Sequence, residues 1–165
     1  LHRPSNVDRR ETLEPLVQQL VEVSRDLPPV FAVHPRTRRK LEEFGLLATL
    51  SQPATGGARI TLTEPLGYID FLSLTSNASL ILTDSGGLQE ESTALGIPCV
   101  TIRENTERPV TITHGTNRLV GTRTADIVRG YGEARSTPAP ATRPELWDGK
   151  TAPRIAAVFQ EWLFP

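Results

Sequence analysis

Short apolar runs alternate with helical segments along this chain, and that alternation is the feature that most narrows its fold. The runs are a few residues long and rich in Val, Ile and Leu, whereas the segments between them repeat apolar residues at helical spacing. Strands that alternate with helices indicate an α/β fold, in which a parallel sheet carries helices on both faces. The predicted strands are 30–33, 60–63, 80–82, 97–102 and 118–120.

The helical segments are longer and more regular than the strands. In 11–27, apolar residues recur at spacings of 3, 4, 7 and 8, and Asp8 is a candidate N-cap. Thr12 is a rival start because Pro15 would otherwise fall inside the helix. The predicted helices are 11–27, 37–44, 68–75, 87–95, 107–113, 124–134 and 152–163, with loops at 51–58 and 136–144.

Composition excludes several classes of function. The chain has 165 residues and a net charge of −1, so nothing in its charge favours nucleic-acid or anionic-membrane binding. No run of about 18 apolar residues occurs, so no membrane span is predicted. Its single Cys99 lies in an apolar run and is expected to be buried, in a protein of the reducing cytoplasm. Residues 1–6 are typical of a strand end and its loop, so we expect the chain to be cut from a longer protein.

The turn Asp84-Ser85-Gly86-Gly87 follows a predicted strand and opens a predicted helix. Ligands of open α/β sheets bind beyond the carboxyl ends of the strands, which is where this turn lies. The two glycines let a ligand approach the backbone, the helix start presents free N–H groups, and Ser85 adds a hydroxyl. The turn is therefore a candidate phosphate site, although a purely structural Gly-Gly turn explains the pattern equally well.

Two glutamates follow in the same predicted helix. Glu90 and Glu91 lie near its start, where carboxylates favour the helix dipole. Glu91 is also one turn beyond Gly87, so it could face the same ligand, and a carboxylate can accept the two hydroxyl hydrogen bonds of a ribose. The spacing leaves both interpretations open.

Four stretches in order resemble the UDP-N-acetylglucosamine 2-epimerase family. They are "LHRPSNVD" (1–8), "FAVHPRTR" (31–38), "EPLGYIDFL" (64–72) and "LTDSGGLQEESTALGIPCVTIRENTERPVTITHGTNRLVGT" (82–122). The resemblance implies the carboxyl-terminal half of a two-domain GT-B architecture, with residues 1–165 as one UDP-binding domain. The implied partners are a UDP-sugar, an amino-terminal domain absent from these residues and a second copy in a homodimer. Neither a cofactor nor a metal is expected.

The resemblance also implies roles around the diphosphate. Ser85, Gly86 and Gly87 would hold the diphosphate and Glu91 the ribose. Arg108 would pair with phosphate oxygens, although a solvated loop arginine is the plain alternative. The family often has an acidic residue shortly after the Arg-Pro pair, where this chain has Val110.

Four further residues are implied at the cleft. Phe71 and the backbone of Leu66 would hold the uracil, although Phe71 also suits an amphipathic helix core. His2 would stabilise the charge of the leaving diphosphate as a catalytic residue, with a plain loop histidine as the alternative. His34 ends a predicted strand and would face the cleft, where some family members hold a second, regulatory UDP-sugar. His114 is expected at a helix end instead.

The implied reaction is inversion at C2 of UDP-GlcNAc, which gives UDP-ManNAc through elimination and re-addition of UDP. The acid and base carboxylates of the family lie in the other half, so the isolated 165 residues are expected to bind UDP weakly without turnover. Alternatives are a GT-B glycosyltransferase, a hydrolysing epimerase that releases ManNAc, and a nucleotide-sugar binding module without chemistry.

Overall fold

The structure is a computed structural model that describes residues 1–51, 60–137 and 143–164. Five short strands are parallel to their neighbours and confirm the α/β prediction. They form two ladders, one of order β1-β2 and one of order β3-β4-β5. The predicted loops 51–58 and 136–144 lie largely outside the described residues. The strands are β1 (Val30–Ala32), β2 (Thr61–Thr63), β3 (Ile81–Thr83), β4 (Cys99–Thr101) and β5 (Asn117–Leu119).

All seven predicted helices occur, with ends that differ by a few residues from those expected. Two further helices, α1 and α4, escaped prediction because one turn or so of helix carries no periodic apolar pattern. The helices are α1 (Pro4–Val7), α2 (Arg10–Val23), α3 (Pro35–Glu43), α4 (Leu47–Ser51), α5 (Tyr68–Ser76), α6 (Gly86–Leu95), α7 (Val110–Thr113), α8 (Thr124–Ser136) and α9 (Thr151–Leu163).

The start of α2 differs from both sequence alternatives. Arg9 is the N-cap, and Pro15 lies inside the helix. Asp8 instead ends α1, and its carboxylate accepts a hydrogen bond of 2.8 Å from Nε of Arg36. The side chain that was expected to cap α2 therefore ties the first helix to α3.

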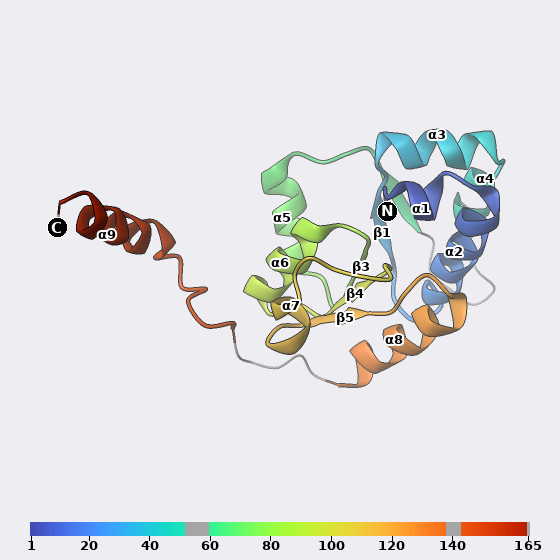
Figure 1. Cartoon of the computed structure of the whole chain (residues 1–165). Coiled ribbons are helices and arrows are strands. Elements are labelled where there is room, and N and C mark those ends of the chain that lie inside the picture. Colours follow the sequence, from blue (N-terminus) through green and yellow to red (C-terminus); the bar gives the residue numbers. More distant parts are fainter. Residues whose placement is uncertain (52–59, 138–142, 165) are drawn as a thin grey trace.

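The helices cover the strands on two sides (Figure 1). Helices α5, α6 and α7 lie on one side of β3, β4 and β5, and α2 and α8 lie on the other. One core cluster packs α2, α3 and α4 onto β1 and β2 and includes Leu13, Val33 and Leu41. A smaller cluster of Leu16, Ile102 and Ile127 joins α2 and α8 to the end of β4. Cys99 is fully buried in β4, as predicted.

Helix α9 extends away from this body (Figure 1), and none of its residues is buried. Its apolar residues recur at helical spacing, as in Ile155, Val158, Phe159 and Trp162, and all four are exposed. The helix predicted from this periodicity is confirmed, but its apolar stripe packs on nothing within the described residues.

Because the strands are parallel, their carboxyl ends point to the same edge of the fold. His34 follows this end of β1, and Asp84 and Ser85 follow that of β3. This edge therefore gathers several of the predicted site residues.

Candidate functional site

The centre of the candidate site is the start of α6. Ser85 is the N-cap, in extended conformation, and its backbone N–H donates to the Thr83 hydroxyl at 3.0 Å. The Ser85 side chain makes no capping bond, so its hydroxyl is available to a ligand. The first N–H groups of a helix lack intrahelical partners, so Gly86, Gly87 and Leu88 present a positive backbone surface here.

The two glycines do different things at this turn. A Cβ on Gly86 would lie 2.6 Å from a terminal nitrogen of Arg108 and 2.9 Å from its guanidinium carbon. A Cβ on Gly87 would meet nothing closer than the Ser85 hydroxyl at 3.9 Å. Gly86 therefore lets Arg108 lie against the helix start, whereas Gly87 leaves an open approach to it.

Arg108 brings its positive charge to the same place, as the resemblance implied. Its Nε lies 2.9 Å from the Glu90 carboxylate, and a terminal nitrogen lies 3.4 Å from Glu107. The contact with Glu90 raises the pKa of Arg108 above its ordinary value. The Nε–H does not point along a hydrogen bond, however, so Glu90 and Arg108 form a close but poorly aligned ion pair. A diphosphate could exchange with this carboxylate without breaking a buried pair.

His2 reaches the site through a contact that sequence reasoning missed. Its Nδ1 lies 2.9 Å from Oδ1 of Asp84, a fully buried carboxylate. Asp84 also accepts hydrogen bonds from the backbone N–H groups of His2 and Arg3 and from the side-chain amide of Asn6. Asp84 thus fixes the chain start beside the turn.

Burial sets the charge state of this pair. It lowers the pKa of His2 below its ordinary value, and the negative charge of Asp84 offsets part of that effect. Burial raises the pKa of Asp84, whereas the hydrogen bonds from the N–H groups of Arg3 and His2 lower it. Burial thus disfavours the charged form of His2, and the neighbouring carboxylate favours it.

His34 lies next to His2. The centroids of the two rings are 5.5 Å apart, tilted by 40°. His34 is the N-cap of α3, and its Nδ1 accepts the backbone N–H of Arg36 at 3.1 Å. The structure thus brings His34 and His2 together at the carboxyl edge of the strands. The imidazole of His34 is exposed there and can contact a ligand.

Glu90 and Glu91 do not fit the simplest interpretation of the sequence, in which both carboxylates favour the helix dipole. Helix α6 begins at Gly86 and carries no acidic residue in its first turn, which weakens the dipole explanation for Glu90 and Glu91. Glu90 pairs with Arg108. Glu91 is half-buried, one turn beyond Gly87 and without an ion pair among the described residues, so it is the carboxylate free for a ligand.

Phe71 and Leu66 belong to α5 and to the segment before it. Phe71 is half-buried on α5, where its side chain lines an apolar cavity between β1 and β3. Leu66 is exposed in the segment before α5. Their predicted role in holding uracil remains a prediction. His114 is the C-cap of α7 and lies outside this group, as expected.

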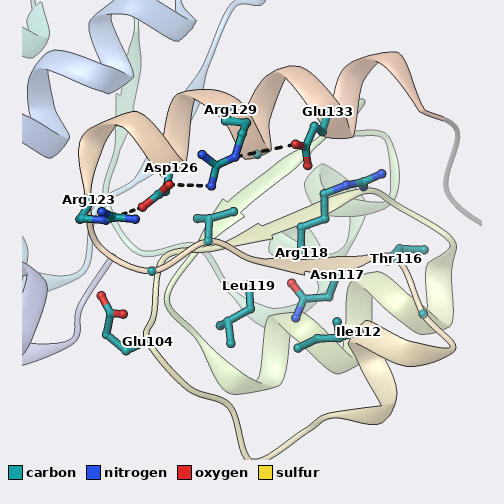
Figure 2. Close-up of a pocket in the computed structure, with 14 residues that line it drawn as sticks. Glu104, Ile112, Thr116, Asn117, Arg118, Leu119, Arg123, Asp126, Arg129 and Glu133 are labelled. Atoms are coloured by element: carbon teal, nitrogen blue, oxygen red, sulfur yellow. Dashed lines mark hydrogen bonds and ion pairs between the residues drawn. The ribbon is translucent and has the colours of Figure 1, made fainter.

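A hollow outside this group of residues lies along the outer edge of β5 (Figure 2). It measures about 680 Å³ and is bordered by α8 and α7. Its charged groups neutralise one another, because Asp126 lies 2.6 Å from both Arg123 and Arg129, and Arg129 lies 3.9 Å from Glu133. The start of α8 borders this hollow, but Asp126 lies in its first turn, so an anion is favoured at the start of α6, whose first turn carries no acidic residue.

Among the described residues, no three His, Cys, Asp or Glu side chains gather as metal ligands. Within the same residues, no helix is both long and apolar enough to cross a bilayer.

A parallel α/β fold with a glycine-lined helix start at the carboxyl edge of its strands defines a Rossmann-like domain. The family model described as UDP-N-acetylglucosamine 2-epimerase matches residues 1–160, and the chain belongs to this family. The resemblance seen in the sequence is thereby confirmed, and the fold is that of a Rossmann-like half of the GT-B architecture.

Relatives and solved structures agree on the family. The UDP-N-acetylglucosamine 2-epimerase of Methanocaldococcus jannaschii is 44% identical over 131 residues, which are 78% of this chain and 35% of that protein. The UDP-2,3-diacetamido-2,3-dideoxy-D-glucuronate 2-epimerase of Pseudomonas aeruginosa is 38% identical over 122 residues, 73% of this chain and 32% of that protein. The M. jannaschii crystal structure in complex with UDP-GlcNAc and UDP matches with a TM-score of 0.85 and 38% identity, over 97% of this chain and 43% of that one. The chain thus spans about a third of the length of these two curated relatives.

Proposed function

We propose that residues 1–165 form the UDP-binding domain of an enzyme that interconverts UDP-GlcNAc and UDP-ManNAc. The observation that carries the proposal is the guanidinium of Arg108 lying against Gly86 at the start of α6. A guanidinium and free helix N–H groups at one point form a site for a phosphate group. The complex of the M. jannaschii relative with UDP-GlcNAc and UDP supports this ligand class.

In this proposal, each group at the start of α6 has a part in holding UDP. The N–H groups of Gly86 and Gly87, the Ser85 hydroxyl and Arg108 hold the diphosphate. Glu91 accepts the ribose hydroxyls from the next turn of α6. The uracil lies toward the start of α5, between the Leu66 backbone and the Phe71 ring.

The proposed reaction is elimination followed by re-addition. A base removes the C2 proton, the electrons of that C–H bond form a C1–C2 double bond, and the C1–O bond breaks with its electrons on the diphosphate. UDP then adds back to C1 as C2 takes a proton on the opposite face. Because C2 is weakly acidic, stabilising the departing diphosphate lowers the barrier as well as binding the substrate.

His2 takes the catalytic part within this domain. As negative charge grows on the diphosphate, the neutral imidazole gains a proton more readily, and the resulting cation stabilises that charge. Asp84 orients the ring through Nδ1. The groups that move the C2 proton come from the remainder of the full-length protein, in an opposing amino-terminal domain, and a homodimer is the proposed assembly.

One relative supports a second candidate substrate. The Pseudomonas aeruginosa protein acts, by its name, on a UDP sugar with acetamido groups at C2 and C3 and a carboxylate. A UDP site of this kind would serve either sugar, since it contacts the nucleotide. Competition between the two UDP sugars for the full-length enzyme decides between them.

The test of the function has two parts. Calorimetry on the 165-residue chain should show binding of UDP, weaker binding of UMP and none of uridine, because the second phosphate meets Arg108. The full-length protein should form UDP-ManNAc from UDP-GlcNAc without an acceptor. Release of free ManNAc would indicate a hydrolysing epimerase, dependence on an acceptor a glycosyltransferase, and binding without any product a non-catalytic module.

A further inference from the structure

A ring of hydrogen bonds, called the polar ring below, connects α6, α7 and β5 to the loop that carries Arg108. Gln89 and Thr111 are fully buried, and Asn117 is nearly so. Polar side chains at this depth are costly unless they are hydrogen-bonded, so their arrangement constrains the structure around them. The members of the polar ring are Gln89 of α6, Thr106 and Arg108 of the loop after β4, Thr111 of α7 and Asn117 of β5.

Both backbone polar groups of Arg108 belong to the polar ring. The N–H of Arg108 donates to the Thr106 hydroxyl oxygen at 3.1 Å. The C=O of Arg108 accepts the Thr111 hydroxyl at 2.8 Å. The backbone is therefore held on both sides of the Arg108 Cα, which sets the point from which the side chain reaches Gly86 at the start of α6.

Gln89 closes the polar ring from the side of α6. Its Oε1 accepts the Thr106 hydroxyl at 2.6 Å and the Asn117 side-chain amide at 3.3 Å. The same amide nitrogen of Asn117 also donates to the Thr111 hydroxyl oxygen at 3.2 Å. Each hydroxyl thus donates one of these bonds and accepts another, and the two hydrogens of the Asn117 amide supply the remaining two. The ring is therefore complete, with a donor and an acceptor in every contact.

Asn117 ties the polar ring to the sheet. It lies in β5, where it pairs with Cys99 of β4. Its Oδ1 accepts the hydroxyl of Thr101, a fully buried residue of β4, at 2.6 Å. The loop that carries Arg108 is therefore fixed to two strands and to α6 at once.

We propose that Gln89 is a positioning residue for Arg108. Acting through Thr106 and Asn117, it holds the backbone of Arg108 so that the guanidinium meets a diphosphate at the start of α6. The inference rests on the proposed function, because it takes Arg108 as a group that holds the diphosphate of UDP. Gln89 follows Gly87 by two residues, so the helix whose first N–H groups bind the diphosphate also sets the place of the arginine. A group held in place before the ligand arrives loses less freedom on binding.

Calorimetry with UDP on the full-length protein tests the proposal through Gln89→Met, which keeps the length of the side chain and removes the acceptor. We expect the affinity for UDP to fall about tenfold, a usual coupling for residues of one hydrogen-bond network. In the Arg108→Ala background, Gln89→Met should change the affinity less than about twofold, because no guanidinium is left to position. A loss of equal size in both backgrounds would overturn the proposal.

Thr106 supplies a second test, which also serves if Gln89→Met does not fold. Thr106→Val removes the hydroxyl at nearly the same shape, whereas Thr106→Ser keeps it. The Val variant should lose UDP affinity as Gln89→Met does, and the Ser variant should keep it. Equal affinity of the two variants would contradict the polar ring as the support of Arg108.

Ser24→Ala is the control for a general loss of stability. Ser24 is buried at the end of α2, and its hydroxyl donates to the Val21 C=O at 2.6 Å, outside the polar ring. This variant should unfold more easily and bind UDP normally. A loss of UDP affinity as large as that of Gln89→Met would show that lowered stability alone explains the effect.

Arg108→Ala by itself separates the failure of this inference from that of the proposed function. Unchanged UDP affinity in Arg108→Ala would refute the diphosphate site at α6, and the role of Gln89 with it. Weaker binding in Arg108→Ala together with normal binding in Gln89→Met would leave the site in place and refute only the positioning role.

Discussion

Nδ1 of His2 lies 2.9 Å from Oδ1 of Asp84, although 82 residues separate them in the chain. The contact joins the start of the chain to the end of β3 and lies beside the turn that opens α6. One buried carboxylate thus orders the segment that carries the proposed catalytic histidine.

Replacing Asp84 with Ala should destabilise the domain. The buried amide of Asn6 and the N–H groups of His2 and Arg3 would lose their acceptor, and a single buried unsatisfied donor costs about 1–3 kcal/mol. Urea unfolding measures the loss. Asp70→Ala is the control, because Asp70 is exposed in the first turn of α5 and should cost about 1 kcal/mol or less. Equal losses of unfolding free energy in the two variants would contradict the role of Asp84 in ordering the start of the chain.

Replacing Gly87 with Val should weaken UDP binding about tenfold or more, because the new side chain occupies the open approach to the helix start. The fold should survive, since a Cβ there meets no atom closer than 3.9 Å. Gly132→Val is a matched control, because Gly132 lies in α8 with nothing within 4 Å. Calorimetry with UDP compares the two variants, and unaltered affinity in Gly87→Val would refute the turn assignment.

Gly86→Ala should act through Arg108. The added methyl would lie 2.6 Å from the guanidinium and displace it, whereas the backbone has no conflict. We expect Arg108→Ala alone to cost about 1.5–3 kcal/mol of UDP binding, the usual range for hydrogen bonds to charged groups. In a double-mutant cycle, Gly86→Ala should then add little in the Arg108→Ala background. Additive losses would mean that Arg108 and Gly86 serve the ligand separately.

Glu91→Ala should weaken UDP binding by about 1.5–3 kcal/mol while leaving stability nearly unchanged, because the carboxylate anchors the ribose. Glu11→Ala is the control, since Glu11 is an exposed carboxylate in the first turn of another helix, α2. The measurements are UDP calorimetry and thermal unfolding of both variants. A loss of stability with normal affinity would instead favour a purely structural role for Glu91.

The folded state should lose stability as the pH falls from about 7.5 to about 5.5. Burial lowers the pKa of folded His2 below its unfolded value of about 6.5, so the unfolded chain binds the proton more readily. The stability that folding gains from keeping His2 neutral is fully present above a pH of about 6.5, and it is lost as the pH falls through the lower pKa of folded His2. Urea unfolding should therefore show a smaller loss for His2→Gln than for the unchanged protein. A gain in stability toward acid would mean that Asp84 dominates and raises the pKa of His2.

The sequence predicted the local features of this molecule better than its long-range contacts. The apolar runs became strands, and the Ser85-Gly86-Gly87 turn lies at the start of α6 because strand, glycine and helix signals are all local. The link from Asp84 to His2 could not be read from spacing, although a carboxylate that ends an apolar strand is a signal worth following. The contact of Arg108 with Gly86 could not be read from spacing either, because it depends on the path of the chain after β4.

Other features could not be predicted from the pattern of apolar and polar residues. Helices α1 and α4 are too short to show a periodic apolar face. The division of the strands into two ladders could not be predicted either, because spacing along the chain does not show which strands pair. Glu90, which the sequence linked to the helix dipole, pairs with Arg108, and this contact between distant parts of the chain could not be predicted from spacing.

A crystal structure of the chain with bound UDP tests the central claim most directly. The account predicts the diphosphate on the N–H groups of Gly86 and Gly87, with Arg108 turned from Glu90 to the phosphate oxygens. A diphosphate bound instead in the hollow beside β5, with the start of α6 empty, would contradict it.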